Sequence, residues 1–214
     1  MTIVRVVGKG RVAAMTNEEF DAARSGMART FVDVGTGDGR YAREVATEQP
    51  RWLVIGIDAL AEPMEEAARK AKRKNLLFVR AAIESVPAEL HRVADTVSVM
   101  LPWGALLEGI VLARDDILHG IASVCAPGGR VEVTLNGEIW LDSTPARFAD
   151  LPLPTPDYVA EVVAPGFARA GIDIGPAREL TAAEAKGIAS TWARKLGHGR
   201  DHPTFVRFDG IARG

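Results

Sequence analysis

Two hydrophobic patterns alternate along most of this chain. Short apolar runs typical of buried strands lie near residues 30–34, 52–57, 76–80, 95–100 and 130–136. Patterns typical of helices lie near 39–47, 62–73 and 104–124. Such alternation predicts βαβ units, and therefore an α/β fold whose mostly parallel sheet is covered by helices on both faces.

The N-terminal residues predict an addition to that sheet. Two β-like runs, 3–7 and 11–14, are separated by Gly8-Lys9-Gly10, which predicts a hairpin extension over residues 1–15. Thr16-Asn17-Glu18-Glu19 then has the residues of a helix capping box.

The C-terminal third begins with a proline-rich stretch. Residues 137–156 have little periodicity, which predicts a long surface loop. The remaining pattern predicts a helix, a strand, a helix and a strand near 157–170, 172–179, 181–196 and 204–212.

Composition narrows the class of protein without identifying it. The chain has 214 residues, of which 47% are hydrophobic and 25% charged, and this predicts one soluble globular domain. Its single cysteine, Cys125, excludes an intrachain disulfide and fits a reducing cytoplasm. The N-terminus lacks the layout of a secretory signal, and the longest apolar run, Thr96 to Leu107, is too short to cross a bilayer. We therefore expect a cytoplasmic protein without a membrane partner.

The run from Phe31 to Gly39 is the most informative stretch of the chain. An apolar strand ends in Asp33 and turns through alternate glycines, beginning with Gly35 and Gly37, where the missing Cβ lets the backbone approach a ligand. The dinucleotide fingerprint G-x-G-x-x-G would need a glycine in place of Arg40. The D-x-G-x-G-x-G pattern instead resembles the first motif of class I S-adenosylmethionine-dependent methyltransferases, whose glycines admit the amino-acid part of the cofactor.

A second carboxylate supports an adenosine-containing cofactor. The buried-strand pattern that begins at Trp52 ends in Asp58, where an acid can accept hydrogen bonds from ribose hydroxyls. Ile83-Glu84 and Leu101-Pro102-Trp103 also follow predicted strands, and ligands of parallel sheets bind beyond the carboxyl ends of the strands. Each motif alone also fits any nucleotide-binding unit, so the prediction depends on their combination.

Two tryptophans are candidates for holding a base. In Met100-Leu101-Pro102-Trp103-Gly104, Leu101 stands where methyltransferases that modify exocyclic amino groups carry a polar residue, which favours a ring nitrogen as the target. Trp103 and Trp192 would clamp an extracted base and stabilise the cation formed on it by ~0.5–2 kcal/mol for each ring. Taken singly, each tryptophan also fits a packing role.

Basic residues gather in three places, although the formal net charge is −2. The net charge argues against a generic nucleic-acid binder, but the distribution of charge matters more than the sum. For any single cluster, a solvated face or a helix C-terminus is an alternative explanation. The clusters are Arg5, Lys9 and Arg11; Arg69, Lys70, Lys72, Arg73 and Lys74; and Arg194, Lys195, His198, Arg200 and His202.

Segments spread over nearly the whole chain resemble the kanamycin–apramycin resistance family of aminoglycoside-resistance 16S rRNA (adenine-N1) methyltransferases. They are Val7-Gly8-Lys9, Asp33 through Gly39, Met100 through Gly104 with Leu106-Leu107, and Ser190 through Leu196 followed by Arg200. The resemblance implies a class I methyltransferase (Rossmann-like) fold with a seven-stranded, mostly parallel sheet and an antiparallel closing hairpin, in addition to the N-terminal β-hairpin.

The same resemblance implies a reaction and a site. The cofactor S-adenosylmethionine would methylate N1 of a decoding-site adenine in the small ribosomal subunit, while Trp103 and Trp192 hold the flipped base. The residues then expected around the cofactor are Asp33, Gly35, Gly37, Asp58, Ile83, Glu84, Met100, Leu101, Pro102, Gly104, Ala105, Ser190 and Thr191. Those expected on RNA are Lys9, Arg69, Lys70, Lys72, Arg73, Arg194, Lys195, Arg200 and His202. We expect a monomer, because one face must meet the ribosome.

Two positions depart from the family pattern. Ala105 replaces a hydroxyl residue, which removes one expected polar contact with the cofactor. His202 stands where relatives often carry arginine, so its contact would depend on pH. His198 and His202 lack the further ligands that a metal site needs, and we assign no metal.

Two other functions remain open on the sequence. One is another RNA methyltransferase of the same fold, such as a tRNA guanine-N7 enzyme. The other is a small-molecule methyltransferase, or a cofactor-binding domain without RNA activity.

Overall fold

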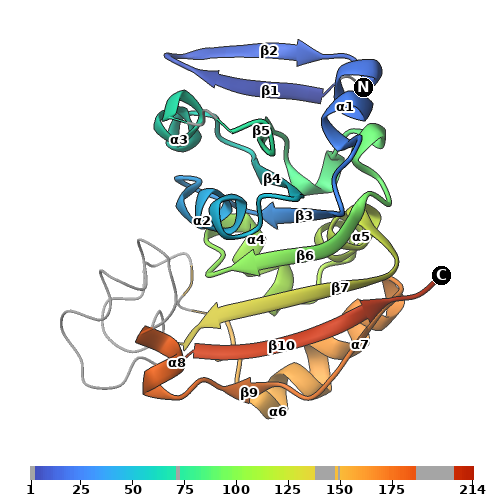
Figure 1. Cartoon of the computed structure of the whole chain (residues 1–214). Coiled ribbons are helices and arrows are strands. Elements are labelled where there is room, and N and C mark those ends of the chain that lie inside the picture. The colour runs from blue at the N-terminus through green and yellow to red at the C-terminus, as the bar shows by residue number, and fades with distance from the viewer. Residues whose placement is uncertain (1–2, 71–72, 138–147, 149, 187–204) are drawn as a thin grey trace.

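A ten-stranded mixed sheet forms the centre of the computed structural model, which describes residues 3–70, 73–137, 148, 150–186 and 205–214 (Figure 1). The strands are β1 Ile3–Gly8, β2 Arg11–Met15, β3 Arg29–Val34, β4 Trp52–Asp58, β5 Leu76–Arg80, β6 Ala94–Met100, β7 Cys125–Asn136, β8 Ile172–Ile174, β9 Arg178–Glu179 and β10 Phe205–Ala212. They lie in the order β2-β1-β5-β4-β3-β6-β7-β10-β8, and β9 pairs with β10.

The strands β5, β4, β3, β6 and β7 are parallel and form the middle of the sheet. Phe31 and Val32 point to opposite faces of β3 and are both buried, which explains the continuous apolar runs in the sequence. The strand order reverses at β3, because β4 pairs on one side of it and β6 on the other. Open α/β sheets bind ligands at such a point, beyond the carboxyl ends of the strands.

Helices cover both faces of the sheet (Figure 1). On one face, α2 (Arg40–Glu48) and α3 (Glu65–Lys70) pack against Phe31, Val54 and Phe78. The larger apolar cluster lies on the other face, beneath α4 (Gly104–Val111), α5 (Asp115–Val124) and α7 (Ala164–Arg169). The structure also describes α1 (Asn17–Arg24), α6 (Pro156–Tyr158), a π-helical turn (Val159–Val163), α8 (Ala182–Lys186) and the 3-10 turns Glu62–Met64, Ile83–Ser85 and Ala88–Leu90. Within these described parts, no helix is long and apolar enough to cross a membrane.

The helix that the sequence predicts near 104–124 is divided into α4 and α5. Ala113 has a φ of 50° and the Arg114 amide donates to the Gly109 carbonyl at 2.8 Å, so the chain turns between the two helices. A Cβ at Gly109 would lie 2.3 Å from Cγ1 of Ile117, which shows how closely α5 folds back on α4. The division depends on this tertiary contact, which apolar periodicity does not reveal.

The strand predicted near 172–179 is likewise divided, into β8 and β9. Gly175-Pro176 lies between them, and proline has no N–H with which to pair. Both short strands pair with β10, which is itself antiparallel to β7. Together β8 and β9 occupy the last position of the predicted seven-stranded sheet, so the α/β methyltransferase fold agrees with the prediction.

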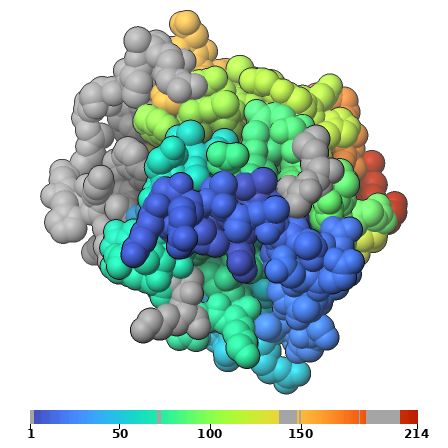
Figure 2. All heavy atoms as spheres, turned by 90° about the horizontal axis from the view of Figure 1, so that it is seen from above, coloured from blue at the N-terminus to red at the C-terminus, as the bar shows by residue number. Residues whose placement is uncertain are grey.

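The N-terminal hairpin extends the same sheet at its other edge. β1 pairs antiparallel with β2 and also with β5. At the hairpin tip, Gly8, Lys9 and Gly10 have φ angles of 84°, 58° and 69°. A Cβ at Gly8 would lie 3.1 Å from Cβ of Arg69, so the tip and α3 lie side by side, as Figure 2 shows from above.

The predicted capping box is present at the start of α1. The Glu19 amide donates to Oγ1 of Thr16 at 3.2 Å, and the Thr16 amide donates to Oε2 of Glu19 at 2.9 Å.

Candidate active site

A cavity of about 570 Å³ lies at the carboxyl ends of β3, β4 and β6, where the strand order reverses. This volume is in the ordinary range for a small-molecule site. The cavity brings together residues that the sequence placed at separate strand ends. The predicted residues that line it are Asp33, Gly35, Gly37, Asp58, Ile83, Glu84, Met100, Leu101, Trp103 and Ala105.

The glycine turn after β3 forms one wall of the cavity. Gly35 and Gly37 have φ angles of 72° and 55°, which side chains rarely adopt. The amides of Gly35 and Thr36 both donate to the Ile57 carbonyl, at 2.8 and 3.0 Å, and so hold the turn against β4. A Cβ at Gly35 would lie 2.6 Å from Leu106, whereas a Cβ at Gly37 would meet no protein atom within 4 Å. The backbone at Gly37 is therefore open to a ligand.

Asp33 is buried at the end of β3, with 2% of its surface exposed. Burial raises the pKa of its carboxyl to about 7, the Thr36 hydroxyl that donates to it opposes the shift, and the nearby Asp58 and Asp38 add to it. The Thr36–Asp33 hydrogen bond is 2.6 Å long. A carboxyl in this state gains stabilisation from any cation that enters the cavity.

Asp58 ends β4 on the other side of the turn. Its Oδ2 accepts from the Gly37 amide and its Oδ1 from the Leu60 amide, each at 3.0 Å. These bonds fix the carboxylate, and each oxygen keeps a lone pair for another donor. Such an acid is placed to accept hydrogen bonds from ribose hydroxyls.

The turn between β6 and α4 forms another wall of the cavity, through Met100, Leu101 and Trp103. Leu101 has a φ of 50°, and its amide donates to the Thr134 carbonyl at 2.9 Å. Pro102 is buried, and Gly104 begins α4 with a φ of 61°. These two residues shape the turn, but they are absent from the set of residues that line the cavity. Their contact with the cofactor stays a prediction.

Trp103 stands at the rim of the same cavity. Its side chain is 42% exposed, whereas the Phe148 ring that it meets edge to face is fully buried. The two ring centroids are 4.9 Å apart at an interplanar angle of 84°. A large aromatic face is therefore held in place and remains partly open to solvent.

The sequence missed several residues of the cavity. Thr36 lies inside the glycine motif, and its hydroxyl, three residues after Asp33, is the sequence feature that could have predicted their hydrogen bond. Tyr41 lies in the first turn of α2, at the same end of the sheet as the motif. Leu106 and Ile117 come from α4 and α5, and no local pattern distinguishes them from core residues.

Other predicted residues lie outside the described residues. They are Ser190, Thr191 and Trp192, and the basic residues Lys72, Arg194, Lys195, Arg200 and His202. His198 also lies there. In the part of the chain that is described, no group of three or more His, Cys, Asp or Glu residues could hold a metal ion.

The described basic residues lie on the hairpin tip and on and after α3. Lys9, Arg69, Lys70 and Arg73 are all exposed. Lys70 forms an ion pair with Glu66, one helical turn before it. Because the tip adjoins α3, these cations belong to one surface, which we call the hairpin–α3 surface.

The cavity suits a ligand that has both a ribose and a cationic amino acid. Asp58 offers lone pairs at one strand end, Asp33 offers a buried carboxyl at the next, and Gly37 leaves its backbone open between them. Together with the strand order, this arrangement defines a class I S-adenosylmethionine-dependent methyltransferase.

Comparison with known proteins gives the family. The model of the NpmA family, 16S rRNA (adenine(1408)-N(1))-methyltransferase, matches residues 4–210, and the chain belongs to that family. A 16S rRNA (adenine(1408)-N(1))-methyltransferase of Streptoalloteichus tenebrarius is 38% identical over 97% of this chain and 96% of its own.

Solved structures agree with the family. A mutant 16S rRNA (adenine(1408)-N(1))-methyltransferase from Catenulisporales acidiphilia, crystallised with cosubstrate SAM, is 35% identical and superposes with a TM-score of 0.91 over 99% of this chain and 97% of that one. The 16S rRNA methyltransferase KamB, also 35% identical, gives 0.88 over 99% of this chain and all of that one. The predicted family, fold, enzyme class and cofactor are confirmed.

Proposed function

We propose that this chain transfers a methyl group from S-adenosylmethionine to N1 of adenine 1408 of 16S rRNA in the small ribosomal subunit. Trp103 supports the proposal most directly. Its ring stands half-exposed at the rim of the cofactor cavity, in a chain whose family modifies that atom.

The reaction requires the protein to orient the cofactor and the adenine, and to stabilise the positive charge that forms on the base. When bound, the cofactor supplies a methyl group on a sulfonium that leaves as a neutral thioether while the N1 lone pair forms the new N–C bond. N1 is unprotonated at neutral pH, so no side chain has to act as a base. Asp58 and the glycine turn would hold the cofactor, and the face of Trp103, at the rim of the same cavity, would receive the base.

The methylated ring carries a delocalised positive charge. An aromatic face stabilises such a cation by ~0.5–2 kcal/mol. We assign the opposite face of the flipped adenine to Trp192, with Ser190 and Thr191 approaching the cofactor from the same segment.

The hairpin–α3 surface is the proposed docking face for ribosomal RNA. Lys9, Arg69, Lys70 and Arg73 supply exposed cations there, and phosphate contacts of this kind position a protein on RNA without reading its sequence. Lys72, Arg194, Lys195, Arg200 and His202 complete the proposed set.

Methylation at N1 would place a methyl group and a positive charge where cationic aminoglycosides bind, which gives resistance to them. The enzyme would act as a monomer in the cytoplasm, where assembled subunits are found.

Reverse transcription across the decoding site tests the proposal. Methylation of N1 blocks Watson–Crick pairing, so we expect a stop at adenine 1408 that depends on the cofactor when unmodified small subunits are the substrate. Parallel reactions with labelled cofactor use purified tRNA and naked 16S rRNA. Label in tRNA without a stop in rRNA would support the guanine-N7 alternative, and no transfer to any RNA would favour a small-molecule substrate.

A further inference from the structure

Tyr41 has no role in the function described so far, although it lines the cofactor cavity. It is the second residue of α2 and follows the glycine turn directly. Its ring meets the buried Phe31 ring edge to face, with the centroids 6.0 Å apart at 72°. The position of the phenol is thus fixed from β3, on the face of the sheet that α2 covers.

A row of polar side chains crosses the sheet beneath this phenol. Asp33 of β3 is paired with Ser98 of β6, and Ser98 is paired with Glu132 of β7, so the three side chains share a face. Asp33 and Ser98 are almost completely buried. Tyr41 lines the cavity, and its hydroxyl lies beside this row, to which β3, β6 and β7 each contribute one polar side chain.

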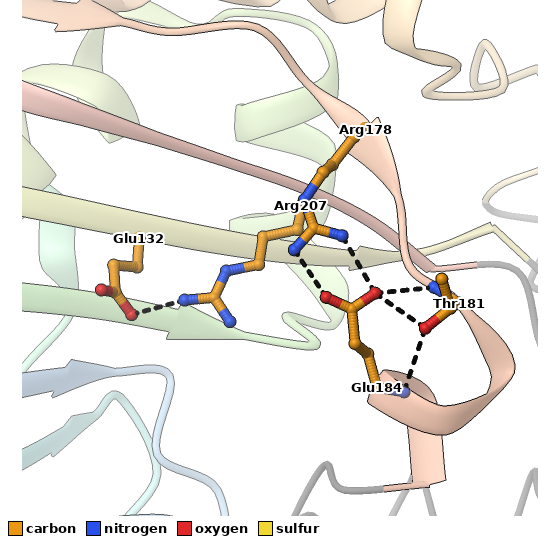
Figure 3. A network of polar contacts seen from close by, with 5 residues as sticks. All are labelled: Glu132, Arg178, Thr181, Glu184 and Arg207. Carbon is orange, nitrogen blue, oxygen red and sulfur yellow. Dashed lines mark hydrogen bonds and ion pairs between the residues drawn. The ribbon is translucent and has the colours of Figure 1, made fainter.

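The hydroxyl of Tyr41 is kept in its neutral form. Burial raises its pKa to about 12, the charges of Asp33 and Glu132 add to the shift, and a hydrogen bond with Ser98 and the charge of Arg207 oppose it. Glu132 has its own partners, because it accepts from Arg207 at 2.9 Å and pairs with Arg130 at 3.0 Å (Figure 3 shows the Arg207 contact). A neutral phenol beside a satisfied carboxylate can donate to an anion that enters the cavity.

The order of the strands indicates which anionic group of the ligand Tyr41 would bind. Asp58 on β4 suits the ribose of the cofactor, and Trp103 after β6 suits the flipped adenine of the RNA. Asp33 on β3 lies between these two strands, and Tyr41 of α2 lines the same cavity directly after the glycine turn. We propose that Tyr41 binds the carboxylate of the cofactor's amino-acid part, while Asp33 faces its ammonium group, so that Tyr41 selects cofactors that keep this part. The inference deepens the proposed function at the cofactor site, and it does not depend on the proposed RNA substrate.

Calorimetric titration of Tyr41→Phe with two adenosine thioethers tests the proposal. S-adenosylhomocysteine has the amino-acid part, and 5′-deoxy-5′-methylthioadenosine lacks it. Because a hydrogen bond to a charged group is lost, we expect Tyr41→Phe to weaken S-adenosylhomocysteine roughly tenfold and to leave the methylthio compound within about twofold. Binding of the second ligand also reports that the variant is folded.

Tyr158→Phe is the matched control, because it is the other tyrosine of the chain. Its hydroxyl donates to the Val111 carbonyl at 3.0 Å, and it is not among the residues that line the cavity. It should bind both ligands like the parent protein.

An equal loss for both ligands in Tyr41→Phe, or no loss for either, would overturn the proposal. Neither ligand involves RNA, so this result is independent of the decoding-site assay. In that assay Tyr41→Phe should raise the KM for S-adenosylmethionine with little change in kcat.

Discussion

Among the single residues of the site, Asp33 departs furthest from its ordinary chemistry. With a pKa of about 7 it is half protonated at neutral pH, because burial opposes its ionised form and Asp58 and Asp38 repel it. The cofactor's ammonium group favours the ionised form, so binding must release the proton that Asp33 carries at lower pH. The structure thus connects cofactor affinity to a buried carboxyl rather than to a histidine.

Cofactor affinity should therefore fall as pH is lowered from about 8 to about 6. One unit below the pKa, only about a tenth of the molecules have the ionised carboxyl, so the dissociation constant of S-adenosylhomocysteine should rise roughly fivefold to tenfold. Calorimetry over this range measures the effect. Asp33→Asn should bind more weakly and show no dependence on pH in the same window; a flat profile for the parent protein would contradict the assignment.

Trp103 carries the prediction on catalysis. Trp103→Ala removes the aromatic face that stabilises the methylated base, so we expect kcat to fall by roughly twofold to thirtyfold, with Trp103→Phe intermediate. Single-turnover transfer of labelled methyl groups to small subunits measures it. Trp52→Phe is the control, since Trp52 packs against Phe31 at the start of β4. Unchanged methyl transfer by Trp103→Ala would contradict the proposal that Trp103 and Trp192 hold the adenine between them.

At the scale of elements, the glycine turn after β3 allows the effect of a substitution on folding to be distinguished from its effect on cofactor binding. Gly37 and Gly128 both have positive φ angles, 55° and 74°, and a Cβ at either would meet no protein atom within 4 Å. Alanine at either position therefore carries the same left-handed strain of about 1–2 kcal/mol. Only Gly37 lines the cavity.

We therefore expect Gly37→Ala and Gly128→Ala to lower Tm by similar amounts, while only Gly37→Ala weakens S-adenosylhomocysteine, by tenfold or more. Thermal denaturation and calorimetry on the same samples measure both effects. Equal affinity in the two variants would show that the cofactor does not approach the backbone at Gly37.

The elements also show how far the sequence alone predicts the site. Parallel strands such as β3 and β4 were predictable because both their faces are buried, and Asp33 and Asp58 were predictable because each lies at the end of such a run. The break between α4 and α5 was not, since it depends on the contact between Gly109 and Ile117. Tyr41 reaches the cavity only because α2 packs over β3, and the shift of the Asp33 pKa follows from burial that no motif encodes.

At the scale of the whole molecule, charge is distributed unevenly around a net value of −2. The hairpin lies at the β5 edge of the sheet, and its tip, which includes the exposed Lys9, adjoins α3 at Gly8 and Arg69. Many other arginines are paired, for example Arg213 with Asp173, and Arg178 with Glu184 (Figure 3). An arginine that is paired with a carboxylate of the same chain attracts RNA phosphates less strongly than an unpaired one. The near-neutral total is therefore compatible with one basic face.

Charge reversal on the hairpin–α3 surface should weaken binding to small subunits without affecting the cofactor. Lys9→Glu and Arg69→Glu should each lower affinity about uniformly across RNA sequences and reduce the salt slope by about one, as expected for a lost phosphate contact. Lys70→Glu should have a smaller effect, because Lys70 already shares its charge with Glu66. Binding of labelled subunits at several salt concentrations measures this, with Arg51→Glu, an exposed residue at the amino end of β4, as the control. If Arg51→Glu weakened binding as much as Arg69→Glu, the effect would come from net charge, and the hairpin–α3 surface would not be the docking face.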